Sequence, residues 1–193
     1  MKKFLHDYSY CIVKMFIYQF AISIFGAMLS MATNAVRNNT LSIVASILSV
    51  LFYLFLLYTM TWEIGAKDRI SVDAGKKKRN LNLGLLLSLF ANIPNFLIAI
   101  IYTAVSPFMG AHEWAGNINA AIKLLSLLFE GMYTGITSKI TLNVGGTVYA
   151  LHYFWWSYFL IIIPALATAW LAYYSGYRNT RFGAMFTGPK KKK

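Results

Sequence analysis

The sequence predicts an all-α, polytopic membrane helical bundle, with four spanning helices plus one amphipathic helix that is interfacial or re-entrant. Of its 193 residues, 58% are hydrophobic and 17% aromatic, whereas only 12% are charged. This leaves too little polar surface to cover a soluble globule. Four apolar stretches each have the roughly 20 residues that a helix needs to cross the hydrocarbon core. Most basic residues lie beside the ends of these stretches, as they do in cytoplasmic loops.

The apolar stretches define the domain organisation. The predicted spans are about 11–33, 41–62, 82–104 and 153–175. With short connections they account for most of the chain, so residues 1–193 form a single integral membrane domain. Residues 63–81 are then a cytoplasmic loop and residues 176–193 a cytoplasmic tail.

Each predicted span carries a line of small or polar residues on one face. Lipid tails are as apolar as leucine, so contact between spans relies on such residues. Members of a line are three or four positions apart, which places them on one side of a helix. The four lines are Gln19, Ser23, Gly26 and Ser30; Ser42, Ser46, Ser49 and Tyr53; Gly84, Ser88, Asn92, Asn95 and Ala99; and Pro164, Ala165, Thr168, Ala172 and Ser175. We expect all four to face the interior of the bundle.

The loop between the second and third spans is strongly basic. Four consecutive basic residues directly precede the third span: Lys76, Lys77, Lys78 and Arg79. Near an anionic leaflet each basic residue contributes about 1 kcal/mol of attraction. We therefore predict that these residues contact anionic lipid headgroups on the cytoplasmic side. Glu63 and Lys67 are spaced i,i+4 and predict an ordinary ion pair at the end of a helix.

Two asparagines and a proline interrupt the third predicted span near its middle. Pro94 has no N–H to donate to the carbonyl of Phe90, which leaves that oxygen for a side chain, water or ligand. Asn92 and Asn95 flank the proline, and polar groups at this depth are costly unless they are partnered. One interpretation is a polar binding site of the kind found in transporters with broken helices. The favoured interpretation is a proline kink whose asparagines bond between helices.

Residues 116–136 predict an amphipathic helix rather than a fifth span. Lys123 and Glu130 would each cost about 2.5–3.5 kcal/mol near the membrane centre, whereas each Ile, Leu or Phe returns only about 0.3–0.6 kcal/mol. Asn119, Lys123, Ser126 and Glu130 form one polar stripe on a helix. We expect an interfacial or re-entrant helix on the extracytoplasmic side with this stripe facing lipid headgroups. The less favoured alternative is that Lys123 and Glu130 serve proton or cation coupling.

The segment after this helix predicts a short hairpin and then the last span. Gly145 and Gly146 indicate a turn between 140–142 and 148–150. Aromatic residues gather at both ends of 153–175, as is typical of membrane interfaces.

The distribution of Lys and Arg predicts the orientation. Fifteen of the 18 basic residues lie in three groups: before or early in the first span, between the second and third spans, and after the fourth. All three groups reach the cytoplasm only if the number of spans is even. Four spans with both termini cytoplasmic are therefore favoured over five.

Motifs for catalysis, metals and cofactors are missing from the sequence. It contains no HExxH, GxSxG or P-loop pattern and only six acidic residues, so we expect no enzyme. Cys11 is the single cysteine and the three histidines are far apart, so we predict no metal and no cofactor. The net charge of +12 lies mainly beside span ends, which favours lipid rather than nucleic acid as the partner.

These observations favour a small non-enzymatic protein of a bacterial-type plasma membrane, acting as a subunit or partner of a larger membrane complex. The alternative is a small permease or channel, functioning as a homo-oligomer, with its pathway along Asn92, Pro94 and Asn95. A lipid-modifying enzyme that uses Glu130 and a histidine is a third class, for which no motif gives support.

Overall fold

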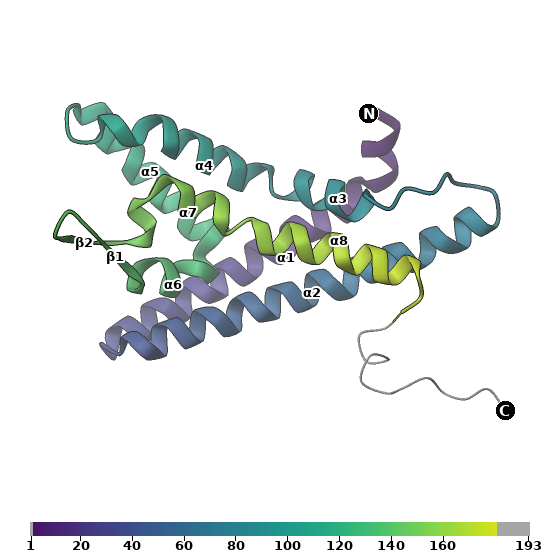
Figure 1. Cartoon of the computed structure of the whole chain (residues 1–193), viewed down its shortest axis with the longest axis horizontal. Helices are drawn as coiled ribbons and strands as arrows, with labels where there is room; N and C mark the ends of the chain where they lie inside the picture. Colours follow the sequence, from purple (N-terminus) through teal and green to yellow (C-terminus); the bar gives the residue numbers. More distant parts are fainter. Residues whose placement is uncertain (1, 181–193) are drawn as a thin grey trace.

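The computed structural model describes residues 2–180 as a long helical bundle with one small hairpin (Figure 1). Its elements in chain order are α1 (Lys2–Ala35), α2 (Asn39–Asp73), α3 (Leu83–Ala91), α4 (Ile93–Val105), η1 (Ser106–Phe108), α5 (Glu113–Glu130), η2 (Gly131–Tyr133), α6 (Thr134–Lys139), β1 (Thr141–Val144), β2 (Thr147–Ala150), η3 (Leu151–Tyr153), α7 (Trp155–Leu160) and α8 (Ile163–Tyr177). Here η denotes a short 3₁₀ helix. The predicted all-α class is therefore correct in its main feature.

Among the described residues, three helical segments are long and apolar enough to cross a membrane: His6–Ala35, Asn39–Asp73 and Trp155–Tyr177. The pair Leu83–Ala91 and Ile93–Phe108 meets the same criterion jointly but bends by 59°. These apolar helices make membrane insertion physically reasonable. Both α1 and α2 extend beyond the predicted spans; the 35 residues of α2 correspond to about 52 Å of helix.

Two helix breaks lie beside prolines, and one of them is at the predicted Pro94 kink. Asn92 separates α3 from α4, and Pro94 lies in the first turn of α4. Pro164 occupies the same position in α8, just after the break that follows α7. Proline is well tolerated in a first turn because its missing N–H has no partner there in any case. Each proline therefore marks the start of a new helix.

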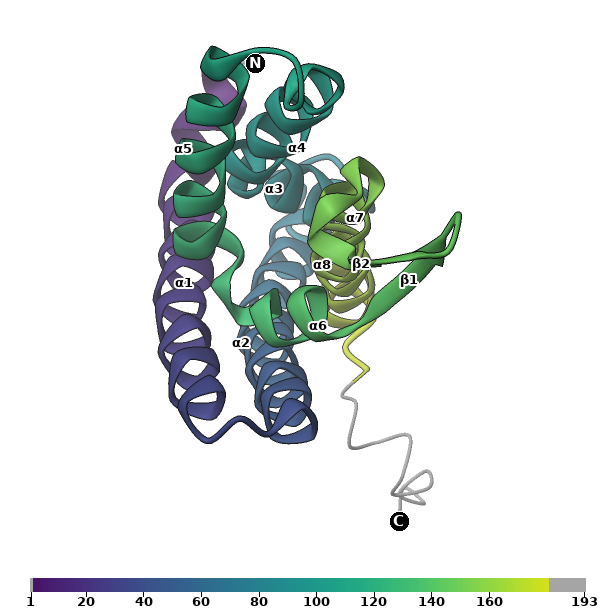
Figure 2. The same cartoon turned by 90° about the vertical axis from the view of Figure 1, so that its left-hand side faces the viewer.

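The predicted helix 116–136 is broken into three pieces, which differs from the expectation of one continuous amphipathic helix. The segment α5 runs back along α4 and α1, η2 turns the chain, and α6 packs on α2 (Figure 2). The break follows Glu130. At the next residue, Gly131, the backbone lies directly against α1.

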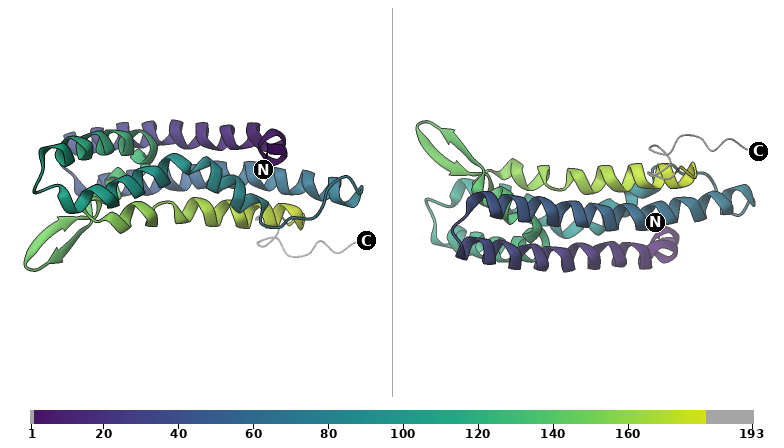
Figure 3. Two further views of the ribbon diagram at one scale, coloured as in Figure 1. Left: turned by 90° about the horizontal axis from the view of Figure 1, so that it is seen from above. Right: turned by 90° about the horizontal axis from the view of Figure 1, so that it is seen from below.

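The predicted hairpin is present. Strands β1 and β2 pair antiparallel, with Thr141 opposite Ala150 and Val144 opposite Thr147. Gly145 and Gly146 both have positive φ, 62° and 85°, as a tight two-residue turn requires. The hairpin projects from the bundle at the end opposite the 74–82 loop (Figure 3).

The interior lines predicted from the sequence are largely confirmed. Every member of the first three lines is buried. In the fourth line Ala165 and Ala172 are buried, but Ala169 and Tyr173 take the places expected for Thr168 and Ser175. Gly84 packs directly on the backbone of Ala169. Close contacts with glycines of neighbouring helices therefore determine which face of α8 is buried.

Candidate functional site

Two glycines seat the turn after α5 in the groove between α1 and α2. A Cβ atom on Gly131 would lie 2.5 Å from the Ser23 carbonyl oxygen of α1, and one on Gly135 would overlap the Ser42 carbonyl oxygen of α2. Gly131 and Gly135 form a GxxxG pattern, which on its own is a weak signal. In the structure each glycine contacts a different helix, so the pattern serves close packing on both sides of the turn.

Side chains of α1 and α2 bind the carbonyl groups that the break leaves outside regular helix. Ser23 Oγ donates to the Phe129 carbonyl at 2.8 Å, and Gln19 Nε2 donates to the same oxygen at 3.2 Å. Ser46 Oγ donates to the Met132 carbonyl. Buried carbonyl groups must find such partners away from water. Three residues of the predicted interior lines therefore hold the turn in place.

This turn leaves the Glu130 carboxyl group inside the protein. Glu130 is only 4% exposed. Its Oε2 atom accepts a hydrogen bond from Ser126 Oγ at 3.1 Å, whereas within residues 2–180 its Oε1 atom has no hydrogen-bond partner and the side chain forms no ion pair. Burial disfavours the charged form of a carboxyl group that has only the Ser126 hydroxyl beside it as a hydrogen-bond donor. Glu130 is therefore suited to taking up a proton or a small cation.

Glu130 borders a small polar hollow that is continuous with a larger one. The inner hollow is about 30 Å³, which is enough for one water-sized group. Its lining residues are Ser126, Glu130, Tyr133, Thr134, Thr137, His152, Ser157, Tyr158 and Ile161. The outer hollow, about 180 Å³, shares five of these residues and extends to Lys123 and Ser138. Polar side chains thus connect the buried carboxyl with the hairpin end of the bundle.

His152 is one of the residues that line both hollows. Its Nδ1 atom lies 3.3 Å from the Thr137 carbonyl oxygen, and its own carbonyl accepts hydrogen bonds from the hydroxyl groups of Tyr102 and Tyr158. Burial lowers the pKa of His152; the Thr137 hydrogen bond opposes this, and the charge of Lys123 adds to it. The His152 imidazole is therefore neutral at neutral pH.

Lys123 does not pair with Glu130. It is exposed, and its Nζ atom lies 5.2 Å from the centre of the Tyr153 ring. The polar stripe of α5 borders the two hollows through Lys123, Ser126 and Glu130. The burial of Glu130 differs from the headgroup-facing position expected from the sequence, because the turn at Gly131 draws the end of α5 into the bundle, whereas Lys123 is exposed.

Asn92 and Asn95 are both buried and bonded to each other at the bend of the third predicted span. Asn95 Nδ2 donates to Asn92 Oδ1 at 3.1 Å, and Asn92 Nδ2 donates to the Ser88 carbonyl at 2.8 Å. These bonds remain within α3 and α4, as in a local kink, whereas Pro94 is half-buried and begins α4. The Asn92 side chain also interacts with Tyr53 of α2.

The asparagines and the carboxyl group each lie beside a buried tyrosine, Tyr53 next to Asn92 and Tyr133 next to Glu130. Tyr53 and Tyr133 belong to the same buried cluster, and Tyr133 lies beside Glu130 in the inner hollow. Within the described residues, the Tyr133 hydroxyl has no hydrogen-bond partner. The structure thus pairs Asn92 with Asn95 and places Glu130 at a separate hollow.

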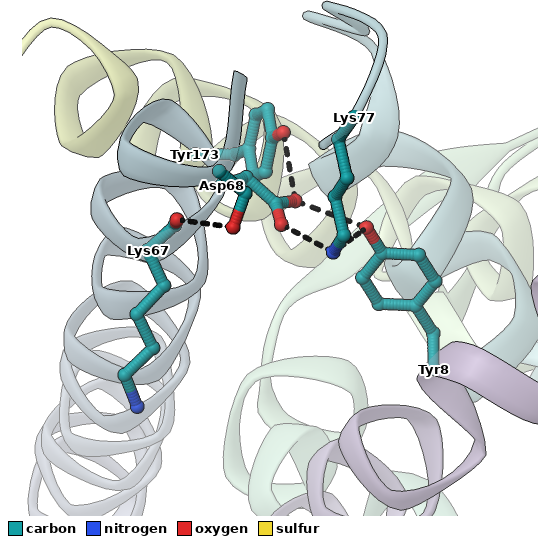
Figure 4. Close-up of polar contacts among 6 residues, drawn as sticks. Tyr8, Lys67, Asp68, Lys77 and Tyr173 are labelled. Atoms are coloured by element: carbon teal, nitrogen blue, oxygen red, sulfur yellow. Dashed lines mark hydrogen bonds and ion pairs between the residues drawn. The ribbon is translucent and has the colours of Figure 1, made fainter. Parts of the chain in front are cut away.

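A second buried acid, Asp68, lies at the other end of the bundle (Figure 4). The Tyr8 and Tyr173 hydroxyls each donate to Asp68 Oδ2 at 3.1 Å, and Lys77 Nζ lies 2.7 Å from Asp68 Oδ1. Partial burial opposes the charged form of Lys77, but its bonds to Asp68 and Tyr8 outweigh this effect and raise its pKa. Sequence reasoning missed this cluster because its residues come from α1, α2, α8 and a loop.

The basic residues before α3 have different environments. Lys77 is tied to Asp68, so it is a structural residue as well as a basic one. Lys78 and Arg79 line a hollow beside this cluster, and Lys76 is exposed. The predicted Glu63–Lys67 pair is present, at 4.0 Å and highly exposed.

Comparisons with protein families, with curated proteins and with solved structures found no match to this chain. Within residues 2–180, no group of three or more His, Cys, Asp or Glu side chains could hold a metal ion.

Proposed function

We propose that this chain is a small, non-enzymatic permease of a bacterial-type plasma membrane, coupled to protons or cations through Glu130. The observation that carries the proposal is a buried carboxyl without a cationic partner, bordered by a polar hollow. Ionisable groups at membrane depth are costly and are typical of ion pathways. The asparagines at the α3–α4 bend supply further polar groups on the opposite side of Tyr53 and Tyr133.

The proposed topology has four spans and places both termini in the cytoplasm. The basic groups of α1, of the 74–82 loop and of the end of α8 lie at one end of the bundle (Figure 1), which agrees with the positive-inside rule. In this topology α3 and α4 form one bent span. The segment from α5 to α6 is re-entrant: it enters from the extracytoplasmic side, turns at Gly131 and returns. Helices broken at membrane depth form ion sites in many transporters.

Flux measurements on proteoliposomes test this function. Vesicles loaded with a pH-sensitive dye should dissipate an imposed proton gradient, with and without a sodium gradient, and Glu130→Gln should reduce the rate to that of protein-free vesicles. Glu113→Gln is the matched control, because Glu113 is exposed at the start of the same helix. Wild-type flux equal to that of empty vesicles, or full flux from Glu130→Gln, would contradict the proposal.

A second candidate, an integral subunit of a larger membrane complex, is favoured by the size of the interior. A hollow of about 30 Å³ next to Glu130 holds no hydrated solute in a single copy. A second copy or another membrane protein would supply the remaining wall of a pathway. Purification as a lone monomer that retains full flux would exclude this role.

A further inference from the structure

Three arginines from separate parts of the chain face one hollow at the end that carries the 74–82 loop. Arg69 comes from α2, Arg79 from the loop and Arg178 from the residue after α8. The hollow is about 360 Å³, and its remaining lining residues are Asp73, Leu81 and Tyr177. The sequence gives little sign of this convergence, because Arg69 and Arg178 are 109 positions apart.

Tyrosine rings support two of the three guanidinium groups. Arg79 Cζ lies 5.6 Å from the centre of the Tyr177 ring, and Arg178 Cζ lies 4.4 Å from that of Tyr174. A guanidinium that rests on a ring face keeps its N–H edges free for a second partner. The end of α8 is itself fixed to α2, because Trp62 Nε1 donates to the Thr180 carbonyl at 2.9 Å.

The charges around this hollow do not balance. Its single carboxylate, on Asp73, lies 3.6 Å from Arg69. In the described part of the chain, neither Arg79 nor Arg178 has an acid within ion-pairing distance, and residues 181–193 contain no Asp or Glu. Like charges that share one hollow repel each other. An anion between Arg79 and Arg178 would relieve this repulsion.

We infer that this hollow binds the phosphate group of an anionic phospholipid. Arginine forks match phosphate oxygens with two parallel hydrogen bonds. Leu81 and Tyr177 give the same hollow an apolar wall, which suits the glycerol and first acyl carbons of a lipid but adds nothing for free phosphate. Trp62, Tyr174 and Tyr177 mark this level as a membrane interface. The inference is independent of Glu130 and of transport.

Lipid titration of the delipidated full chain in neutral detergent tests the inference. A short-chain phosphatidylglycerol should raise the melting temperature, whereas phosphatidylcholine and inorganic phosphate at the same concentration should not. Replacing Arg79 and Arg178 together with Gln should weaken the apparent affinity roughly tenfold or more, since each basic residue contributes about 1 kcal/mol near an anionic headgroup. The matched control, Arg37→Gln with Lys139→Gln, removes two charges outside this hollow, one between α1 and α2 and one at the end of α6, and should change the affinity less than about threefold.

A second variant keeps the test decisive if the Gln pair does not fold. Arg79→Lys with Arg178→Lys retains both charges but loses the bidentate fork, so it should bind phosphatidylglycerol more weakly than the wild type. Wild-type affinity in Arg79→Lys with Arg178→Lys, or an equal loss of affinity in the Gln pair and the control pair, would show attraction to bulk charge and overturn the inference. Stabilisation by inorganic phosphate equal to that by phosphatidylglycerol would overturn it as well.

Discussion

The chemistry of this molecule depends on a few buried polar groups that have different partners. Asp68 has a lysine and two tyrosines around it, whereas Glu130 has one serine hydroxyl. Removing one partner from a buried ion pair leaves a costly charge, so the first group is suited to holding the loop in place. Glu130 has no cationic partner among the described residues, so protonation of its carboxyl group breaks no ion pair. Environment, rather than residue type, therefore separates a paired buried acid from an unpaired one.

His152 predicts a defined dependence of stability on pH. Burial lowers its pKa from the ordinary value of 6.5, so below that pH the unfolded chain binds more protons than the folded one. The contribution of His152 to stability is fully present above pH 6.5 and is lost as the pH falls below this value. Thermal melting in detergent should therefore show a larger loss between pH 7.5 and pH 5 for the wild type than for His152→Gln.

His112→Gln is the control for this measurement, because His112 is exposed at the tip between α4 and α5. Tyr133, Tyr158, Lys123 and Glu130 surround the same hollows and are present in both proteins. Their titration therefore cancels to first order in the comparison. Identical pH profiles for the wild type and His152→Gln would refute the assigned role.

At the scale of elements, the turn at η2 determines what α5 can do. A continuous helix over 116–136 would carry the residues after Glu130 onward along the direction of α5, whereas the break lets the chain enter the groove between α1 and α2. Serine hydroxyls from both helices bind the carbonyls of the turn. The close contacts at Gly131 and Gly135 act together with these hydrogen bonds. The turn therefore packs with α1 and α2 as one unit.

Adding one methyl group at this turn should test that unit. Gly131→Ala places a Cβ 2.5 Å from the Ser23 carbonyl oxygen, and overpacking of this kind costs about 1–3 kcal/mol. Gly116→Ala is the matched control on α5, where a Cβ meets nothing within 4 Å and alanine gains roughly 0.5–1 kcal/mol over glycine. Unfolding in detergent should rank Gly116→Ala above the wild type and Gly131→Ala below it. An unchanged Gly131→Ala would show that the contact is not tight.

Periodic features of the elements could be predicted from the sequence, and features set by single contacts could not. Small and polar residues three or four apart correctly identified the inner faces of α1, α2 and the α3–α4 pair, because a helix turns any such spacing into one face. The paired glycines likewise predicted the β-hairpin. The break after Glu130 was missed because it goes with the contact between Gly131 and Ser23 of α1. These two residues are far apart in the sequence, so no local pattern shows the contact.

For the whole molecule, the candidate site is assembled by contacts between segments that are distant in sequence. The sequence singled out Asn92, Asn95 and Glu130 by their residue type alone. The buried tyrosines beside them, Tyr53 next to Asn92 and Tyr133 next to Glu130, come from α2 and η2, and no local pattern carries that information. The Asp68 cluster and the arginine hollow were missed for the same reason. Charge counting predicted the grouping of basic residues at one end because that feature needs no contacts.

The proposed membrane topology depends most on the re-entrant path of α5 and α6, and cysteine accessibility measures that path directly. In a Cys11→Ser background, single cysteines at Ala111 and Val144 should react with a membrane-impermeant maleimide added to intact cells. Cysteines at Lys78 and Thr180 should react only after the membrane is permeabilised. All four positions are exposed in the folded chain. Labelling of Ala111 and Val144 from opposite sides of the membrane would mean that this segment crosses it, and would contradict the account.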